Sequence, residues 1–431
     1  CDHLPMADPT TTPRSRDRSR PHDIVLWGAT GFTGQLVAEY LTRHHLGDAH
    51  DPPLRLALAG RNRKKLERVR ADLARIRPEA AELPLLVGDS FDAASLDAIA
   101  EQASVVCTTV GPYAKYGAEL VAACVRHGTD YCDLTGETQF IRRMIDAHQD
   151  EAVRTGARIV HCCGFDSIPS DLGTLMLQEE AKERYGAPLR EVKFFAGESK
   201  GGFSGGTVAS MLNLLEEAER DPHVRKVMGH PYALNPDGER RGPDGSDQKG
   251  VRYDDDLGMW TAPFIMAAIN TRVVRRSNAL MGYAYGKDFR YSEVMSTGKG
   301  PAGLARAAAV TAGMGGFVAG VAIKPIRKIL EDRVLPAPGE GPDAEAREEG
   351  FFVVRLLGET ADGRKVRGRV EGDHDPGYGE TALMLGESAV CLALEGAELD
   401  APGGIRTPAS TMGATLIQRL RRAGMVFRIE G

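Results

Sequence analysis

The sequence has no excess of positive charge and no paired-cysteine motif. Lys and Arg number 54 against 60 Asp and Glu in 431 residues, a net charge of −6. No global basic field therefore exists to hold nucleic acid. The seven cysteines form no CxxC pair and stand mostly inside apolar runs, which is the pattern of reduced thiols in the cytoplasm. We expect small molecules or proteins as partners, no nucleic acid, and a cytoplasmic location.

Signatures of other enzyme classes and of export are absent too. The chain holds neither the GxSxG elbow of serine hydrolases nor the P-loop lysine pattern. Residues 10–21 (TTTPRSRDRSRP) have almost no apolar side chains. They cannot form the apolar core of a signal peptide or offset the entropy of ordering. We expect residues 1–22 to be a flexible basic tail.

Glycine, by contrast, is abundant, with 50 residues where an average composition gives roughly 30. From residue 23 to residue 164, short apolar runs alternate with helical patterns, the order expected of a parallel sheet wound with helices. The six runs are 24–27, 54–59, 83–87, 105–110, 131–134 and 158–162. We predict an α/β fold in which residues 23–164 form a Rossmann-type doubly wound parallel sheet.

The alternation ends after Gly164, and residues 165–400 are predicted to form a second, mixed α+β domain. Residues 351–357 and 365–371 flank a turn at Asp362-Gly363 and predict a hairpin. Residues 231–256 are rich in Pro, Gly and charge, which predicts a long surface loop, and residues 336–350 read as a polar linker. Within residues 401–431, Thr407-Pro408 predicts the start of a helix that runs through Arg422.

The segment 307–323 is uncharged and is flanked by Arg306 and Lys324. It is too short and too rich in Ala and Gly for a membrane span. Its larger apolar residues fall on one helical face, and basic flanks suit anionic lipid. A buried or interdomain helix is the favoured interpretation, and a peripheral membrane contact is the alternative.

A glycine-rich turn follows the first predicted strand and precedes a helix. Glycine permits a tight turn, and a backbone without Cβ lets a pyrophosphate approach the free N–H groups of the helix N-terminus. The spacing is GxxGxxG, and the context of strand before and helix after favours dinucleotide binding over a plain turn. The predicted contacts are Gly28, Ala29, Thr30, Gly31, Phe32, Thr33 and Gly34.

The end of the second predicted strand indicates which dinucleotide binds. An NAD site usually has a carboxylate there, but this chain has Arg61 and Asn62, and no acidic residue until Glu67. Arg61 can meet a 2′-phosphate with forked hydrogen bonds, so NADP(H) is favoured. Asp89 and Ser90, after the third strand, are predicted at the adenine edge.

The fourth and sixth predicted strands end at the edge of the sheet that faces the nicotinamide. Gly111 and Pro112 are expected to wall the ring, and Tyr113 is placed either to donate a proton or to pack. No Tyr-x-x-x-Lys pair is formed. Asp166 and Ser167 are expected either to contact substrate or nicotinamide, or to serve in helix capping and loop packing.

His161, Cys162 and Cys163 have the residue types of a metal site. Adjacent cysteines on a strand point to opposite faces, so we predict no metal there.

Several stretches of the chain resemble the saccharopine dehydrogenase-like oxidoreductases, most closely the actinobacterial branch of trans-acting enoyl reductases. The stretches are DIVLWGATGFTGQLVAEYL (23–41), LALAGRN (56–62), TTVGPYAKYG (108–117), DYCDLTGE (130–137), CCGFDSIPSDLG (162–173) and TPASTMGATLIQRLRRAGMVF (407–427). The resemblance covers nearly the whole chain after Asp23. The motifs are specific for the superfamily and not for a substrate.

The resemblance implies an NADP(H)-binding Rossmann domain with contacts from Gly28, Gly31, Gly34 and Arg61, and a C-terminal helix that returns to it. It implies an NADPH-dependent oxidoreductase that reduces a carbon–carbon double bond in an acyl chain held on a partner polyketide synthase, in glycolipid or wax synthesis. A saccharopine dehydrogenase-like enzyme acting on an amino acid, and a non-catalytic dinucleotide-binding scaffold at a membrane or lipid surface, are the alternatives. The oligomeric state is left open.

Overall fold

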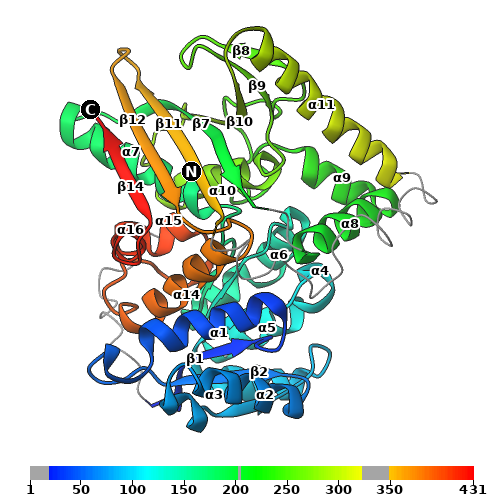
Figure 1. Cartoon of the computed structure of the whole chain (residues 1–431), viewed down its shortest axis with the longest axis vertical. Coiled ribbons are helices and arrows are strands. Elements are labelled where there is room, and N and C mark those ends of the chain that lie inside the picture. Colours follow the sequence, from blue (N-terminus) through cyan, green and yellow to red (C-terminus); the bar gives the residue numbers. More distant parts are fainter. Residues whose placement is uncertain (1–18, 202–204, 323–348) are drawn as a thin grey trace.

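A computed structural model describes residues 19–201, 205–322 and 349–431 of the chain. Most of the expected N-terminal tail, most of the expected linker 336–350 and the end of the apolar segment lie outside the described residues. Figure 1 shows two sheets, one in each half of the molecule, with helices around and between them.

The first sheet has seven parallel strands in the order β13-β6-β5-β4-β1-β2-β3. Its strands are β1 (His22–Trp27), β2 (Leu56–Gly60), β3 (Leu85–Val87), β4 (Ala103–Thr108), β5 (Asp130–Asp133), β6 (Arg158–Val160) and β13 (Gly404–Arg406). Most of these strands are buried along their length, as parallel sheets covered on both faces require. The predicted doubly wound parallel sheet is confirmed. The seventh strand, β13, comes from the far end of the chain and was not predicted.

Helices cover both faces of the first sheet. They are α1 (Phe32–His45), α2 (Arg63–Ala74) and α14 (Gly379–Leu394) on one face, and α3 (Ala93–Gln102), α5 (Ala118–His127) and α6 (Thr138–Thr155) on the other. A short helix, α4 (Tyr113–Tyr116), follows β4. Figure 1 shows α14 lying against α1. The nucleotide domain is therefore completed by a helix from beyond residue 164.

The second sheet is mixed, with seven strands in the order β14-β12-β11-β7-β10-β9-β8. Its strands are β7 (Leu189–Lys200), β8 (Arg252–Asp254), β9 (Met259–Pro263), β10 (Arg290–Gly298), β11 (Phe351–Thr360), β12 (Lys365–Gly372) and β14 (Val426–Glu430). β7 and β10 are parallel, and the other pairs are antiparallel. The predicted hairpin is confirmed as β11 and β12, with Gly363 at a positive φ of 85° in the turn.

The remaining helices pack on the second sheet or beside it. They are α7 (Ile168–Tyr185), α8 (Gly205–Arg220), α9 (Pro222–Gly229), α10 (Ala267–Leu280), α11 (Gly300–Ala322), α15 (Pro408–Thr411) and α16 (Gly413–Arg422). α7 lies against β11, β12 and β14, while α11 lies along β9 and β10. One continuous apolar core runs from α1 and α14 through α16 and α7 to the second sheet.

The C-terminal segment does more than return one helix to the nucleotide domain. Its strand β13 joins the first sheet, its strand β14 joins the second, and α16 packs on α14 and α7. The difference from the expected single helix arises because Gly404, with a φ of 137°, brings a three-residue strand beside β6. The segment therefore links the two sheets.

The expected surface loop 231–256 is buried in its first part. Tyr232 and Leu234 are almost inaccessible to solvent. Arg275 Nη1 donates to the Pro231 carbonyl over 2.9 Å, and Arg276 donates to the Leu234 carbonyl. A buried loop must have its carbonyl groups paired, and the arginines of α10 supply the donors. The prediction of a solvated loop was wrong for this part. The sequence shows that α10 is rich in arginine, but it does not show that these guanidinium groups are buried against the loop.

Candidate functional site

The glycine turn after β1 has the geometry that the motif predicts. Gly28 has a φ of 89°, and a Cβ there would lie 2.5 Å from Val110 Cγ2. A Cβ at Gly34 would lie 2.1 Å from the Gly28 carbonyl oxygen. Neither position accepts a side chain, so glycine closes the turn and lets α1 pack against it.

The N-terminus of α1 is open in the way a phosphate site requires. Gly31 is the N-cap residue, and no side chain hydrogen-bonds to the helix end. A Cβ at Gly31 would meet only the Gly28 carbonyl oxygen, at 3.4 Å. The first N–H groups and the positive end of the helix dipole are therefore available to an anion. These residues fit a dinucleotide pyrophosphate.

The first two residues after β2 have different surroundings. Arg61 is exposed and has no ion-pair partner among the described residues. Asn62 caps α2, where its Oδ1 accepts from Lys65 N over 3.0 Å. Arg63 pairs with Glu67 on the helix surface at 3.2 Å. Arg61, directly after the strand end, is therefore available to meet a 2′-phosphate.

The residues after β3 form a local turn beside an exposed aromatic ring. Asp89 Oδ1 accepts from Phe91 N over 2.9 Å, and Ser90 is buried. Phe91 is 69% exposed, and its ring centroid lies 5.6 Å from that of Tyr116 in an edge arrangement. Sequence reasoning missed Phe91, although an exposed aromatic residue at a sheet edge suits stacking on a base.

The structure does not bring Tyr113 to an open site. Its side chain is 3% exposed, and its hydroxyl donates to the Thr108 carbonyl over 3.2 Å. Burial raises the pKa of this hydroxyl well above its usual value, and the charge of Asp133 adds to the effect. Gly111 is exposed and Pro112 is half-buried at the start of α4.

A buried carboxylate, Glu137, fixes the turn that carries these residues. Its Oε1 accepts from Tyr113 N over 2.7 Å and from Ser210 Oγ over 2.8 Å, and its Oε2 accepts from Ala114 N over 2.9 Å. Burial raises the pKa of Glu137, while these three hydrogen bonds act in the opposite direction. Sequence reasoning missed this role because Ser210 lies far along the chain in α8.

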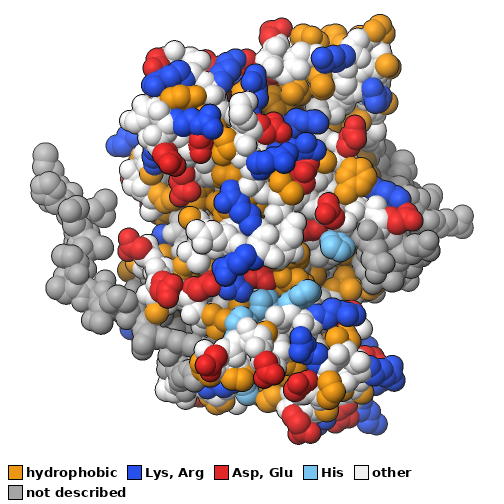
Figure 2. Space-filling model, turned by 60° about the vertical axis from the view of Figure 1, so that its left-hand side comes forward, with side chains coloured by type: hydrophobic (Ala, Val, Ile, Leu, Met, Phe, Trp, Pro, Cys, Tyr) orange, Lys and Arg blue, Asp and Glu red, His pale blue; other side chains and the backbone are white. Residues whose placement is uncertain are grey.

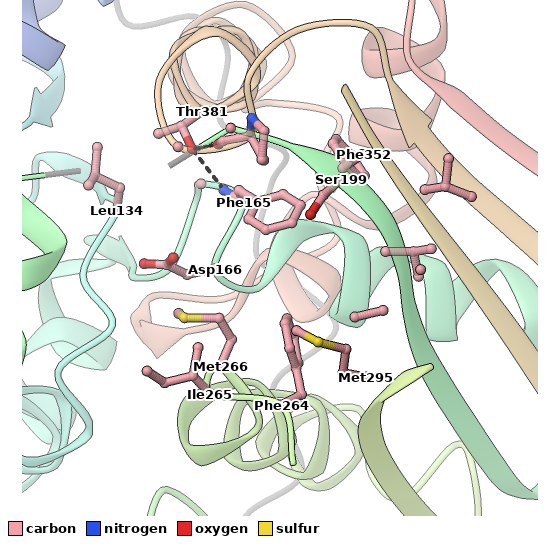
Figure 3. Close-up of a pocket in the computed structure, with 18 of the residues that line it drawn as sticks. Leu134, Phe165, Asp166, Ser199, Phe264, Ile265, Met266, Met295, Phe352 and Thr381 are labelled. Carbon is pink, nitrogen blue, oxygen red and sulfur yellow. Dashed lines mark hydrogen bonds between the residues drawn. The ribbon is translucent and has the colours of Figure 1, made fainter. Parts of the chain in front are cut away.

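A largely apolar cavity of about 240 Å³ lies between the nucleotide domain and the second sheet (Figure 3). Thr33, of the glycine turn, lines it and connects it with the dinucleotide site. The other lining residues are Leu134, Gly164, Phe165, Asp166, Ala196, Gly197, Ser199, Gly201, Phe264, Ile265, Met266, Met295, Phe352, Val353, Val354, Pro376, Gly377 and Thr381. A concave apolar site with a few polar groups is typical of a small-molecule pocket.

Asp166 is the one ionisable side chain among the described residues that line this cavity. Its carboxyl has no hydrogen-bond partner in the described part of the chain, and no dashed line joins it to a neighbour in Figure 3. Burial, assisted by the nearby charge of Asp133, raises the pKa of Asp166 to about 7. An acid with this pKa holds a transferable proton near neutral pH.

Ser167, unlike its neighbour, points into a structural network. It is fully buried, and its Oγ donates to Asn270 Oδ1 over 3.0 Å. Asn270 Nδ2 donates in turn to Glu293 Oε2 over 3.0 Å. Asp171, one turn further along α7, accepts from Ala409 N over 2.8 Å. These contacts position the start of α7 and leave Asp166 alone at the cavity.

The residues that suggested a metal site each make a hydrogen bond to another group of the protein. His161 Nδ1 donates to Asp133 Oδ2 over 2.7 Å, Cys162 Sγ donates to the Thr135 carbonyl, and Cys163 Sγ donates to the Val160 carbonyl. The described residues contain no group of three His, Cys, Asp or Glu side chains able to hold a metal ion.

Comparison with known proteins shows the family of this chain. The family model for the saccharopine dehydrogenase NADP-binding domain matches residues 24–160. A Mycobacterium tuberculosis (strain ATCC 25618 / H37Rv) protein that is provisionally named a trans-acting enoyl reductase is 46% identical over 429 residues, which cover 96% of this chain and 98% of that protein. The chain belongs to the trans-acting enoyl reductase family.

Other relatives carry the same family name. The trans-acting enoyl reductase of Mycobacterium bovis (strain BCG / Pasteur 1173P2) is 42% identical over 421 residues, 95% of this chain and 97% of its own. The apo structure of saccharopine dehydrogenase (L-Glu forming) from Saccharomyces cerevisiae aligns with 95% of this chain and 99% of its own, at 14% identity and a TM-score of 0.49.

Membership of the trans-acting enoyl reductase family confirms the resemblance on which the sequence prediction relied. The match to the NADP-binding domain confirms NADP(H) as the cofactor. This member of the family is therefore an NADP-dependent oxidoreductase.

Proposed function

We propose that the protein is an NADPH-dependent enoyl reductase that acts in trans, on an acyl chain carried by a separate protein. The observation that carries the proposal is Asp166, an acid with a pKa of about 7 in an apolar cavity next to the glycine turn. The names of its relatives support the same reaction. A polyketide synthase in glycolipid synthesis is the class of partner we propose.

The cofactor would be held by residues at the start of the nucleotide domain. Gly28, Gly31 and Gly34 leave room for the pyrophosphate at the N-terminus of α1. Arg61 would bind the 2′-phosphate through its guanidinium fork. When it is bound, NADPH supplies the hydride for the β-carbon of the acyl chain.

Asp166 would supply the proton for the α-carbon. Addition of hydride to the β-carbon moves the electrons of the double bond to the thioester oxygen as an enolate. The Asp166 carboxyl then donates its proton to the α-carbon, the enolate collapses to the thioester, and the carboxylate is reprotonated from solvent. Phe264, Met295 and Phe352 line the cavity, where they would hold an acyl chain and exclude water.

A spectrophotometric assay tests this function. The purified protein should oxidise NADPH in the presence of trans-2-enoyl thioesters, and the rate should rise with chain length as more of the apolar wall is covered. Asp166→Asn should lower kcat by about 10²–10⁴-fold, the range for a general acid. Asp48→Asn, at an exposed carboxyl on the nucleotide domain, is the control. Absence of NADPH oxidation with every enoyl thioester would rule the proposal out.

The amino-acid alternative is disfavoured by the same cavity. A dicarboxylic amino acid calls for cationic side chains, and no Lys or Arg occurs among the described residues that line the cavity. Saccharopine in the same assay is the direct comparison, and we expect no turnover.

We further propose that α11 makes a peripheral contact with lipid, from a cytoplasmic location. Within the described residues, α11 is the one helix that is long and apolar enough to cross a membrane by length and composition, and only 12% of its apolar stretch is buried. Figure 1 shows α11 along the outside of the second sheet. An apolar helix exposed on a protein surface favours a lipid interface.

A further inference from the structure

A row of arginines crosses three strands of the second sheet. Arg428 of β14 lies directly opposite Arg369 of β12, and Arg369 lies directly opposite Arg355 of β11. Directly opposed residues project from the same face of a sheet, with Cβ atoms about 4.5–5.5 Å apart. Three arginine side chains from distant parts of the sequence therefore project from the same face of neighbouring strands. We call Arg355, Arg369 and Arg428 the arginine row.

The charge of the row is only partly neutralised. Arg369 pairs with Glu371. Arg355 and Arg428 are exposed and have no ion-pair partner in the described part of the chain. Like charges directly opposite each other destabilise a sheet. The row therefore maintains a repulsion that an opposite charge from outside would relieve.

Neighbouring cations of the same sheet are treated differently. Lys193 Nζ lies 3.1 Å from Asp254 Oδ2 and 2.6 Å from Asp256 Oδ2. Lys365 Nζ lies 2.6 Å from the other oxygen of Asp256. Acidic side chains on and beside β8 thus neutralise these two lysines, whereas Arg355 and Arg428 have no such partner in the described part of the chain.

The row begins beside the cavity. Arg355 directly follows Val353 and Val354, which both line the cavity. Its Nη1 lies 3.7 Å from the position that a Cβ on Gly197, another lining residue, would occupy. An anionic surface held by the row would therefore lie close to the space proposed for the acyl chain.

In the described part of the chain, the face that carries the row is turned away from α7. α7 packs against the opposite face, where Leu356 and Val370 contact Gly173 of that helix. α11 lies along β9 and β10, at the other end of the sheet. In Figure 2, Lys and Arg side chains are frequent over the upper part of the molecule, where the second sheet lies. A partner can approach the row without displacing a described helix.

We propose that the arginine row is the docking surface for the partner that carries the acyl chain, and that this partner presents a cluster of carboxylates to it. The inference rests on the proposed function, in which a separate protein brings the substrate. A guanidinium binds a carboxylate with two parallel hydrogen bonds, and three in a row match an extended acidic surface. Complementary charge of this kind sets the approach and register of two proteins.

A charge-reversal variant read out on two substrates tests the docking surface. Arg355→Glu/Arg428→Glu changes the two exposed members that have no ion pair. Arg220→Glu/Arg422→Glu is the matched control, because both residues are exposed, lie on helices outside the row and have no ion pair in the described structure. The substrates are the same trans-2-enoyl chain on N-acetylcysteamine and on an acyl carrier domain of a mycobacterial polyketide synthase.

The row variant should lose about tenfold or more in kcat/KM for the carrier-bound substrate, through KM, with a loss that shrinks as salt is added. Its kinetics with the small thioester, and the control variant with both substrates, should stay within about twofold of the parent. Unchanged kinetics with the carrier-bound substrate, or an equal loss with both substrates, overturns the proposal. Sedimentation provides a further test. If the parent is a dimer and the row variant is a monomer, the row binds a second copy of the chain and the proposal is overturned.

Failure of the proposed function is distinguishable from failure of the docking surface. If the parent protein reduces neither substrate, the enoyl reductase proposal fails. Calorimetric titration with the same carrier domain at low salt still tests docking, because binding needs no turnover. Weaker binding to the row variant than to the control variant supports the surface, and equal binding or no binding to the parent refutes it.

Discussion

At the scale of single residues, the chemistry of the glycine turn could be read from the sequence, and the cofactor contacts assigned to it stay a prediction. Gly34 is needed because a Cβ there would meet the carbonyl of Gly28 six positions earlier, and Gly28 is needed because a Cβ there would meet Val110, at the end of a neighbouring strand. Asp166 lines the cavity, and its position could be anticipated because strand ends meet at one side of a parallel sheet. The direction of a side chain is another matter. Tyr113 and Ser167 turn inward to partners that packing supplies, and no spacing rule reveals that.

Asp166 predicts a pH dependence of the reaction. Because the protonated carboxyl is the active form and its pKa is about 7, kcat should be flat below that pH. It should fall about tenfold per pH unit above it. The pH profile of kcat measured with saturating NADPH and a soluble enoyl thioester checks this. A profile that rises with pH through 7 would contradict the role of an acid.

Asp166 also predicts an effect on stability, because the substitution that lowers activity should stabilise the fold. A raised pKa means that ionisation disfavours the folded state, so stability is greatest below about pH 4 and declines as pH rises through 7. Asp166→Asn removes that ionisation and should raise Tm at pH 8 by a few degrees, while Asp48→Asn should not. Thermal unfolding at pH 5 and pH 8 measures the difference. An equal Tm for parent and Asp166→Asn at both pH values would speak against a buried charge.

Arg61 predicts the choice between the two nicotinamide cofactors. Arg61→Ala removes the cation proposed for the 2′-phosphate. The Kd for NADPH should rise about 10–100-fold, in line with about 1.5–3 kcal/mol for hydrogen bonds to charged groups, and the Kd for NADH should hardly change. Fluorescence titration measures both constants. Arg68→Ala, at an exposed position of α2, should leave both unchanged, and a similar loss for NADH would contradict the assignment.

At the scale of elements, the long periodic segments were predictable and the short bridging ones were not. β13 has three residues, too few for an alternation pattern, and its place is set by pairing with β6. The arginine row escaped notice for a related reason, since its members are 14 and 59 residues apart in sequence and only strand pairing aligns them. The residue pattern specifies a helix or strand. The register between two strands specifies which of their side chains come together.

A buried carboxylate joins three helices, and its pKa predicts how the stability of the protein depends on pH. Glu387 of α14 accepts from Tyr40 and His45 of α1 over 2.6 and 2.7 Å, and from Arg419 of α16 over 2.7 Å. Burial alone would raise its pKa, but these partners lower the pKa to about 2. Stability from this group is therefore complete above about pH 4.5 and is lost as the pH falls toward 2.

Glu387→Gln should lower the free energy of unfolding by about 3–5 kcal/mol at pH 7, the cost of breaking a buried ion pair. The difference from the parent should shrink in acid. Urea denaturation at pH 7 and pH 3 measures it. Glu398→Gln, at an exposed carboxyl just after α14, provides the comparison. A loss of stability that is the same at both pH values would show that packing, and not charge, is responsible.

The apolar surface of α11 predicts binding to membranes. Leu304 is 41% exposed on this helix, and Leu304→Asp places a charge where the lipid contact is proposed. The parent should float with vesicles that contain anionic lipid, and the variant should float several-fold less. Thr311→Asp is the comparison variant. It places the same charge on α11 at a half-buried position that already has a polar side chain. Equal flotation of parent and Leu304→Asp would remove α11 from the contact.

At the scale of the whole molecule, the boundary between two domains in sequence is not a boundary in space. The nucleotide sheet takes β13 from the end of the chain, and its face takes α14. The fold class could be predicted because the apolar runs and helical patterns of each sheet follow one another along the sequence. The interlocking could not, since it depends on contacts between residues more than 200 positions apart, such as those of Glu387 with α1.

A fragment experiment measures the interlocking. Residues 19–164 alone should fail to give a cooperatively folded protein, because the β6 edge is unpaired and the apolar face of α1 is uncovered. Near-ultraviolet circular dichroism and binding of an apolar dye are the readouts. The intact chain under the same conditions is the reference. A fragment with a sharp unfolding transition and NADPH affinity equal to that of the intact chain would contradict the expectation.

β13 also determines when, during synthesis, the first sheet can be completed. On the ribosome, at about 5–20 residues per second, the stretch from Val160 to Gly404 takes roughly 10–50 s to synthesise. During that time β6 is an open strand edge, the kind of surface on which nascent chains associate wrongly. Newly made protein should therefore depend on molecular chaperones until its last 30 or so residues emerge.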